Sequence, residues 1–243
     1  MHRPKLGQHF LSARGILAHL AEAACPAREP LVLEIGPGRG ALTEFLLARA
    51  DRVVAIELDR ALAAGLRRRF SQIEVVEADV LAANLAQWGP AAVAGNLPYY
   101  ITSPILERIF AMGPALRRAV VLVQREVAER LVAAPGTRDY GLLTVHTQLF
   151  TRPEILFRVP PAAFSPPPKV ESAAVLLRPH PPAVADAAAF LEFAGRCFAH
   201  KRKTLRNNLL PFYGKQVEDW PEAGLRAEQV PIEGLLELWR RAS

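Results

Sequence analysis

The chain has 243 residues, of which 51% are hydrophobic, enough for one sizeable domain, a small second one and a core that needs no disulfides. Its two cysteines, Cys25 and Cys197, form no CxxC pair and its six histidines show no ligand spacing, so we expect no metal and a cytoplasmic protein. A net charge of +6 only weakly indicates a nucleic-acid partner, and no apolar run is long enough to span a membrane.

Buried-strand patterns alternate with helical patterns through the first three quarters of the chain. Strands are predicted at 31–35, 52–56, 73–76, 91–94, 119–123 and 172–177, with extended chain at 155–159. Helices are predicted from a cap at Ser12 to 24 and at 41–49, 60–70, 103–111, 124–132 and 141–149. This alternation predicts an α/β fold with a mostly parallel sheet covered by helices on both faces.

A proline-rich hinge at 179–182 is the best candidate for a domain boundary. Beyond it the pattern is helical only, with helices predicted within 186–210 and at 231–240. We therefore divide the chain into a larger domain, 1–179, and a small helical domain, 180–243.

A glycine turn, Gly36-Pro37-Gly38-Arg39-Gly40, follows the first of these strands and precedes a helix. Glycines at such a turn let a ligand approach backbone N–H groups at the helix N-terminus. Glu57 ends the next strand, where its carboxylate can accept both hydroxyls of a ribose, and Asp79 ends the third, where it can take an adenine amine. Alternatively, each acid caps the helix that follows it.

Two ligands suit such an edge: a dinucleotide or S-adenosylmethionine. A dinucleotide site favours G-x-G-x-x-G, whereas the spacing here is G-x-G-x-G. S-adenosylmethionine has no pyrophosphate to be held by such a turn. The spacing therefore favours S-adenosylmethionine over NAD.

Asn96-Leu97-Pro98-Tyr99 follows the fourth strand and by itself is typical of a proline-stiffened turn. Beside a methyl donor it gains a chemical role. The Asn96 side-chain carbonyl and the Leu97 backbone carbonyl can accept hydrogen bonds from an exocyclic amine and free its lone pair. Tyr99 would stack on one face of the base and Phe164 on the other, unless Phe164 is a core residue held by the prolines that follow it. The reaction needs alignment and electrostatics more than a base.

These motifs together resemble the small-subunit ribosomal RNA adenine dimethyltransferase family over nearly the whole chain. The resemblance rests on the segments Gly7-Gln8-His9-Phe10-Leu11, 34–38, 56–59, 96–99, 164–172 and 201–209. It implies a Rossmann-like methyltransferase fold, transfer of two methyl groups to each of two adjacent adenosines near the 3′ end of small-subunit (16S) rRNA, and a role in ribosome biogenesis. S-adenosylhomocysteine would be the product.

The resemblance also implies which residues touch S-adenosylmethionine. These are His9, Leu11, Gly36, Glu57, Asp79 and Asn96, and Gly38, Leu58 and Val80 beside them complete the predicted cofactor site. His9 stands where the family commonly has Asn.

A cluster of cations with few balancing acids marks the second domain. It consists of Arg196, Lys201, Arg202, Lys203 and Arg206. We interpret it as an RNA phosphate-binding surface rather than a solvated helix face, whereas the run at 67–69 is interpreted as a solvated helix end. The expected partner is small-subunit rRNA within a pre-ribosomal small subunit, bound by a monomer.

Three alternatives stay open. One is the related large-subunit dimethyltransferase of the macrolide-resistance type, and another is a mainly non-catalytic ribosome assembly factor. A DNA amino-methyltransferase is the weakest of the three. The helix at 201–209 favours the small-subunit branch by resemblance.

Overall fold

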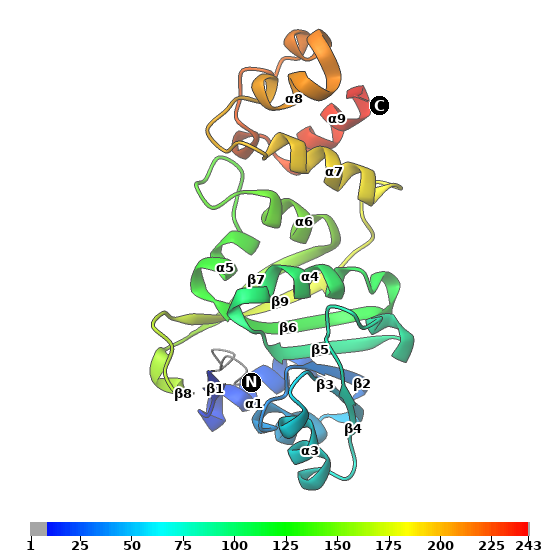
Figure 1. Cartoon of the computed structure of the whole chain (residues 1–243), viewed down its shortest axis with the longest axis vertical. Helices are drawn as coiled ribbons and strands as arrows, with labels where there is room; N and C mark the ends of the chain where they lie inside the picture. The colour runs from blue at the N-terminus through cyan, green and yellow to red at the C-terminus, as the bar shows by residue number, and fades with distance from the viewer. Residues whose placement is uncertain (1–8, 243) are drawn as a thin grey trace, which may run out of the picture. The chain divides into compact units, whose positions relative to one another are not determined.

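A computed structural model describes residues 9–242, so Gly7 and Gln8 of the first resemblance segment lie outside the described residues. Its main element is a seven-stranded sheet in the order β4-β3-β2-β5-β6-β9-β7 (Figure 1). The strands are β2 (Glu29–Ile35), β3 (Ala50–Glu57), β4 (Glu74–Glu77), β5 (Ala91–Asn96), β6 (Leu116–Gln124), β7 (Thr151–Val159) and β9 (Ser172–Pro179). From β4 to β6 all neighbours are parallel, and β9 is antiparallel to both β6 and β7.

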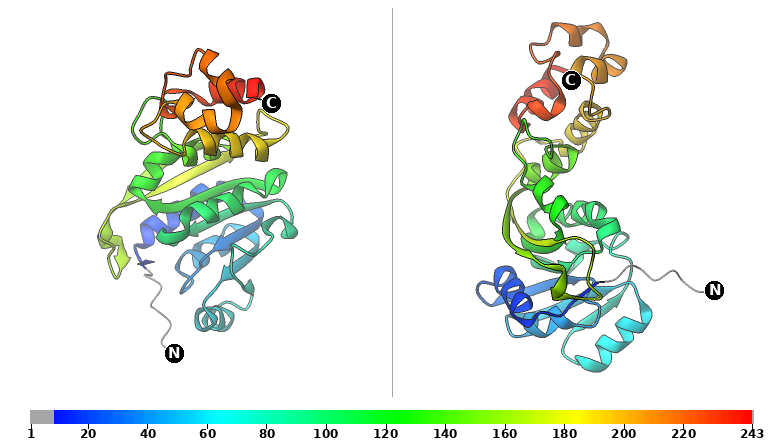
Figure 2. Two further views of the ribbon diagram at one scale, coloured as in Figure 1. Left: turned by 45° about the horizontal axis from the view of Figure 1, so that its top comes forward. Right: turned by 90° about the vertical axis from the view of Figure 1, so that its left-hand side faces the viewer.

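Helices pack on this sheet from both sides. They are α1 (Arg14–Ala24), α2 (Ala41–Leu47), α3 (Arg60–Arg69), α4 (Thr102–Phe110) and α5 (Arg125–Leu131). Figure 2 shows α1 and α4 on opposite sides of the sheet. The predicted α/β fold with a mostly parallel, helix-covered sheet is confirmed.

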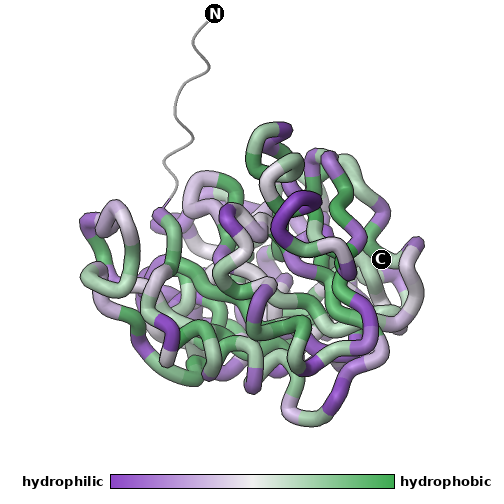
Figure 3. The backbone as a smooth tube through the Cα atoms, turned by 90° about the horizontal axis from the view of Figure 1, so that it is seen from below, coloured by the Kyte–Doolittle hydropathy of each residue, from purple (hydrophilic) through white to green (hydrophobic). Residues whose placement is uncertain are grey.

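The face of the sheet toward α1 is a continuous apolar layer. Alternate residues of neighbouring strands point to it, among them Val32, Val53, Ala92, Val120 and Leu176, and they pack with buried residues of α1 and α2. In Figure 3, green hydrophobic stretches of the tube alternate with purple hydrophilic ones. Strands buried on both faces must be apolar along their length, which explains why their positions were predictable from sequence.

The start of α1 differs from the prediction. Ser12 does not cap the helix: α1 begins at Arg14, and Ala13 precedes it without a side-chain cap. The Ser12 hydroxyl instead donates to the Ala163 carbonyl oxygen at 3.1 Å. A short antiparallel pairing of β1 (Phe10–Leu11) with β8 (Phe164–Ser165) brings these distant segments together.

A second compact unit contains residues 129–150 and 180–243, and the first contains residues 1–128 and 151–179. The unit boundary thus differs from the 179/180 boundary in one segment, since 129–150 groups with the C-terminal helices. The helices of this unit are α6 (Leu142–Phe150), α7 (Ala187–Cys197), α8 (Leu205–Tyr213) and α9 (Ile232–Ala242). Tyr140 and Leu149 are buried in one apolar cluster with Phe190 and Phe193 of α7, which explains the grouping.

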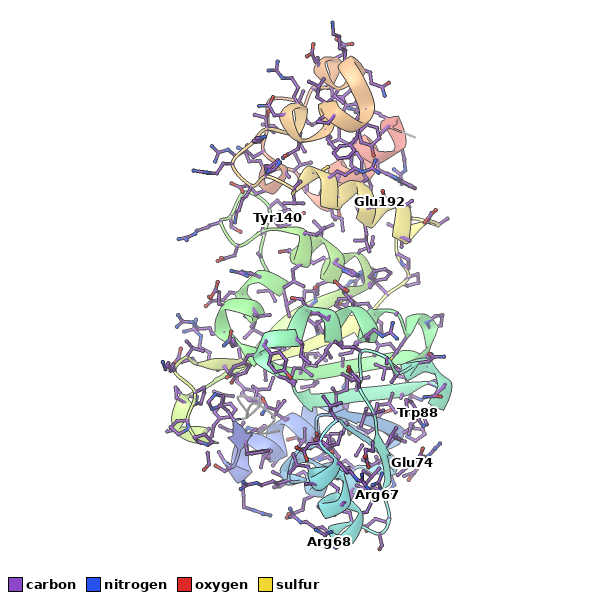
Figure 4. The ribbon with its side chains drawn as sticks, viewed as in Figure 1. Arg67, Arg68, Glu74, Trp88, Tyr140 and Glu192 are labelled. Atoms are coloured by element: carbon purple, nitrogen blue, oxygen red, sulfur yellow. The ribbon has the colours of Figure 1, made fainter. Side chains whose placement is uncertain are left out.

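The arginine run at the end of α3 behaves as the sequence indicated. Arg67 pairs with Glu77 at 3.3 Å, and Arg69 pairs with Glu44 at 2.8 Å. Figure 4 shows Arg67, Arg68, Glu74 and Trp88 at the β4 end of the sheet. Within residues 9–242, no helix combines the length and apolar character needed to cross a membrane.

Candidate active site

A pocket opens at the carboxyl ends of the parallel strands, beside the point where β2 has β3 on one side and β5 on the other. Its empty volume is about 1200 Å³, including the part open to solvent. Open α/β sheets bind ligands at such a switch in strand order. Each predicted cofactor residue lines this pocket: His9, Leu11, Gly36, Gly38, Glu57, Leu58, Asp79, Val80 and Asn96.

The glycine turn forms the floor between β2 and α2. Gly36 and Gly38 have φ angles of +64° and +58°, a region that favours glycine. A Cβ on Gly38 would also lie 2.9 Å from the Phe10 ring. The turn can therefore keep its shape, and its backbone N–H groups their direction, only with glycine at these positions.

Glu57 is buried beside this turn and faces the pocket. Its Oε2 accepts from the Gly38 N–H at 3.0 Å and its Oε1 from the Asp59 N–H at 2.9 Å. Burial raises the pKa of this carboxyl, which the backbone hydrogen bonds partly oppose. Each carboxylate oxygen keeps a lone pair for a further donor. Because Asp59 caps α3 through the Ala61 and Leu62 N–H groups, the capping alternative does not apply to Glu57.

The acid after β4 occupies the next part of the rim. Asp79 is exposed, and its Oδ1 accepts from the Leu81 N–H at 2.9 Å, so it does stabilise a local turn. Val80 is buried next to it, while Leu58 is 50% exposed. These apolar side chains are suited to a flat base near the Asp79 carboxylate.

Asn96 ends β5 at the opposite wall. Its Nδ2 donates to the main-chain carbonyl oxygen of His9 at 2.9 Å, which fixes the orientation of the amide. No hydrogen bond within residues 9–242 uses its Oδ1, so this oxygen remains an acceptor. Leu97 is buried and its N–H is bound to the Leu122 carbonyl oxygen. The predicted acceptor side of the site is therefore built on a rigid strand end.

Tyr99 lies in a short 3-10 helix, Tyr99–Ile101, that follows Pro98. Its hydroxyl shares a 2.7 Å hydrogen bond with Ser172 Oγ of β9. Burial raises the pKa of the Tyr99 hydroxyl. Its ring faces the pocket and stacks on the His9 ring, with centroids 5.9 Å apart and planes inclined by 24°.

Phe164 is not on the pocket wall. Its side chain is 4% exposed and packs in the core layer with Leu11, its partner across the β1–β8 pairing. A ring buried to this extent offers no free face to a base. In this structure Phe164 is a core residue and does not form a wall for a stacked base.

Glu34 lines the pocket too, although the sequence pattern predicted no role for it. It lies in β2, is 1% exposed, and accepts a 2.6 Å hydrogen bond from the Thr43 hydroxyl. Burial raises the pKa of Glu34 to about 7. A buried carboxyl in a binding pocket is a candidate partner for a cationic ligand. The signal in the sequence was an acid inside an otherwise apolar strand.

Four of the five predicted RNA-binding cations are exposed, and the fifth, Arg196, has partners within its own unit. Arg202, Lys203 and Arg206 are exposed and have no ion-pair partner among the described residues. Lys201 is exposed and donates to the Arg138 carbonyl oxygen. Arg196 is engaged within its own unit.

Arg196 lies over the Phe212 ring at 4.7 Å, donates to the Tyr213 hydroxyl at 2.9 Å and pairs with Glu192. These contacts join α7 to α8 and give the Arg196 guanidinium partners within the protein. The position of Arg196 therefore does not support the prediction that it contacts RNA.

Two further cations that the sequence did not bring together lie at this surface. Arg138 is exposed in the loop that Lys201 contacts, and Arg226 is exposed beside Thr204 through an isolated antiparallel bridge. Arg138 and Arg226 are distant from 201–206 in the sequence, so the sequence pattern did not group them with this cluster. Within residues 9–242, no cluster of three or more His, Cys, Asp or Glu side chains is placed to hold a metal ion.

Comparison with known proteins gives one family. Residues 1–239 match the family model described as ribosomal RNA adenine dimethylase. A "Ribosomal RNA small subunit methyltransferase A" from Acidobacterium capsulatum is 46% identical, covering 98% of this chain and 90% of the relative. The same-named protein of Chlorobium chlorochromatii is 44% identical, covering 98% and 92%.

Solved structures agree with these sequences. A dimethyladenosine transferase from Plasmodium falciparum superposes with a TM-score of 0.81 at 26% identity, covering 96% of this chain and 98% of that chain. The 23S rRNA methyltransferase ErmE superposes with a TM-score of 0.74 at 34% identity, covering 96% and 99%.

Proposed function

The chain belongs to the ribosomal RNA adenine dimethylase family, and on that premise we propose that it transfers methyl groups from S-adenosylmethionine to the exocyclic amines of adenosines in small-subunit rRNA. The product is N6,N6-dimethyladenosine, at two adjacent adenosines near the 3′ end of 16S rRNA. The enzyme acts as a cytoplasmic monomer on a pre-ribosomal small subunit and so contributes to ribosome biogenesis.

The observation that carries this proposal is the orientation of Asn96 beside the pocket. Its Nδ2 is held by the His9 carbonyl, which leaves Oδ1 to accept from an amine. Glu57 and the glycine turn lie on the other side of the same pocket, as a nucleoside cofactor requires. One site thus offers a cofactor cradle and an amine acceptor.

The pocket residues fit S-adenosylmethionine by their chemistry. Glu57 suits the ribose hydroxyls, Asp79 with Val80 and Leu58 the adenine, and buried Glu34 a cationic group. When bound, the cofactor supplies an electrophilic methyl group. Asn96 Oδ1 and the Leu97 carbonyl orient the amine and favour its pyramidal form. Tyr99 stacks on the adenine base, and this contact offsets the free energy that the base loses when it leaves its stack in the RNA.

No strong base is required, because the methylated amine is acidic enough to lose its proton to water. The chain's contribution is alignment and the electrostatic setting. The basic surface of the second unit, formed by Arg138, Lys201, Arg202, Lys203 and Arg206, supplies phosphate contacts that position the RNA.

The direct test is incubation of the purified protein with labelled S-adenosylmethionine and small subunits that lack the modification, followed by mass spectrometry of the nucleosides. We expect dimethyladenosine, two per small subunit. Monomethyladenosine alone, or no labelled adenosine, contradicts the proposal.

A large-subunit activity is the second candidate, because the 23S rRNA methyltransferase ErmE is 34% identical over nearly the whole chain. Primer extension on both rRNAs after treatment separates the two: a stop in 16S rRNA supports the first proposal and a stop in 23S rRNA the second. A non-catalytic assembly role would instead be supported if an Asn96→Ala variant rescued a deletion strain.

A further inference from the structure

His9 contacts the predicted base site through both its main chain and its ring. Its carbonyl oxygen holds the Asn96 amide, and its imidazole stacks on Tyr99 with 5.9 Å between ring centroids. The imidazole Nδ1 is also 2.8 Å from the Pro166 carbonyl oxygen. Two of these contacts place His9 against both groups that would receive the target base, and the third anchors its ring.

The distance between the two rings decides what His9 does there. Atoms in contact are about 3.5–4 Å apart, so a flat base between two rings needs about 7 Å between them. The 5.9 Å between the centroids of His9 and Tyr99 is too short for that. A base cannot stack on this face of Tyr99 while the imidazole is in place.

Both rings are anchored in this arrangement, though unequally. Tyr99 is held by Ser172 on β9, in the interior of the sheet. Among residues 9–242, the contacts that hold the His9 ring are an exposed hydrogen bond to Pro166 and the stack itself. The imidazole is therefore the ring that moves when a base arrives, while the main-chain carbonyl can keep its bond to Asn96.

Resting on the proposed function, we propose that the His9 imidazole is a placeholder for the target base: it covers the stacking face of Tyr99 and is displaced when the adenosine binds. This is a positioning and specificity role. It keeps the aromatic wall covered until RNA contacts supply the free energy to replace one stacking partner by another. The main-chain carbonyl of the same residue orients the acceptor amide throughout.

Kinetics with the full chain test the displacement. In His9→Ala, the KM for small subunits should fall about 2- to 10-fold at saturating S-adenosylmethionine, the range for one aromatic contact. His9→Phe, which keeps a ring, should not show this fall. Cofactor affinity is measured for each variant, so that a changed contact to the cofactor is separated from the effect on RNA.

The matched control is His19→Ala. His19 lies on α1, does not line the pocket, and makes an edge contact to Phe157 with ring centroids 6.1 Å apart. The KM of His19→Ala for small subunits should therefore equal that of the wild type. A raised KM in His9→Ala would show that the ring is a wall that holds the base, and an unchanged KM would show that it is a bystander. Either result overturns the proposal.

Proton NMR reads the contact without catalysis. The His9 ring protons should be shifted upfield by the Tyr99 ring, and Tyr99→Leu should abolish that shift. Cofactor together with a short RNA carrying the target adenosines should move the signal in the same direction. A His9 signal that changes neither in Tyr99→Leu nor on addition of RNA overturns the placeholder proposal. Absence of dimethyladenosine from the wild-type reaction would instead contradict the proposed function.

Discussion

The Gly38 N–H donates a 3.0 Å hydrogen bond to Glu57 Oε2, so the glycine turn after β2 and the acid at the end of β3 form one structural unit. The acid that is suited to the ribose also fixes the turn that shapes the cofactor floor. Loss of the carboxylate therefore affects both features.

Glu57→Gln should weaken S-adenosylmethionine binding about 10- to 100-fold, because a charged acceptor of several hydrogen bonds becomes a neutral amide with one acceptor oxygen. Isothermal titration measures this. Glu77→Gln is the matched control, since Glu77 ends the neighbouring strand β4 but pairs with Arg67 rather than lining the pocket. Equal affinities for both variants would contradict the assignment.

Glu34 should make cofactor binding pH-dependent. Its pKa is raised from 4.5 to about 7 by burial, so the cofactor-free protein holds it largely protonated below pH 7. A bound cation favours the ionised form. Affinity should therefore rise between about pH 6 and 8 in the wild type, and the slope should disappear in Glu34→Gln.

The same carboxyl should affect stability with the opposite sign. An acid whose pKa is raised on folding costs stability as pH rises from its unfolded pKa toward its folded one, here from 4.5 to about 7. Without cofactor, urea unfolding of the wild type should lose at most about 3 kcal/mol over this window relative to Glu34→Gln. Parallel pH profiles of the two proteins would refute the assignment.

Asn96→Ala should lower kcat about 100-fold or more, the scale on which preorganised groups in active sites act. The target amine would lose a hydrogen-bond acceptor, and the His9 carbonyl oxygen would lose the Asn96 amide that donates to it. Single-turnover methylation measures the chemical step, and cofactor binding is titrated in parallel. Asn84→Ala, which removes a cap from a surface 3-10 helix, is the control and should retain activity.

Replacing Lys201, Arg202 and Lys203 by Ala should weaken RNA binding and reduce the slope of log affinity against log salt by up to about 2–3. S-adenosylmethionine binding should not change. The matched control removes the same charge from the end of α3, with Arg67, Arg68 and Arg69 changed to Ala. If the control lost as much RNA affinity, net charge rather than this surface would explain binding.

Local pattern was sufficient for most of the fold and for the cofactor side of the site. Val32 and Leu33 belong to a strand buried on both faces, and Gly36 and Gly38 follow it directly, so sequence neighbours determine their positions. The same holds for Glu57 at a strand end.

The misassigned features depend on contacts between distant segments. From the sequence Ser12 resembles a helix cap, whereas in the structure its hydroxyl bonds Ala163. For Phe164 the sequence left both a pocket-wall and a core position open, and its pairing with Leu11 places it in the core. The segment 129–150 joins the helical unit through contacts such as that of the Gly136 N–H with the Glu228 carbonyl oxygen. Such pairings have no local signature.

The hydrogen bond between Tyr99 and Ser172 joins residues 73 positions apart in the chain. During synthesis, the strands that bear the glycine turn, Glu57 and Asn96 emerge well before β9 does. A nascent or truncated chain that ends before Ser172 can contain every residue of the proposed cofactor site and still lack the anchor of the Tyr99 ring. The residues proposed to hold the methyl donor are therefore synthesised before the residue that anchors the Tyr99 ring.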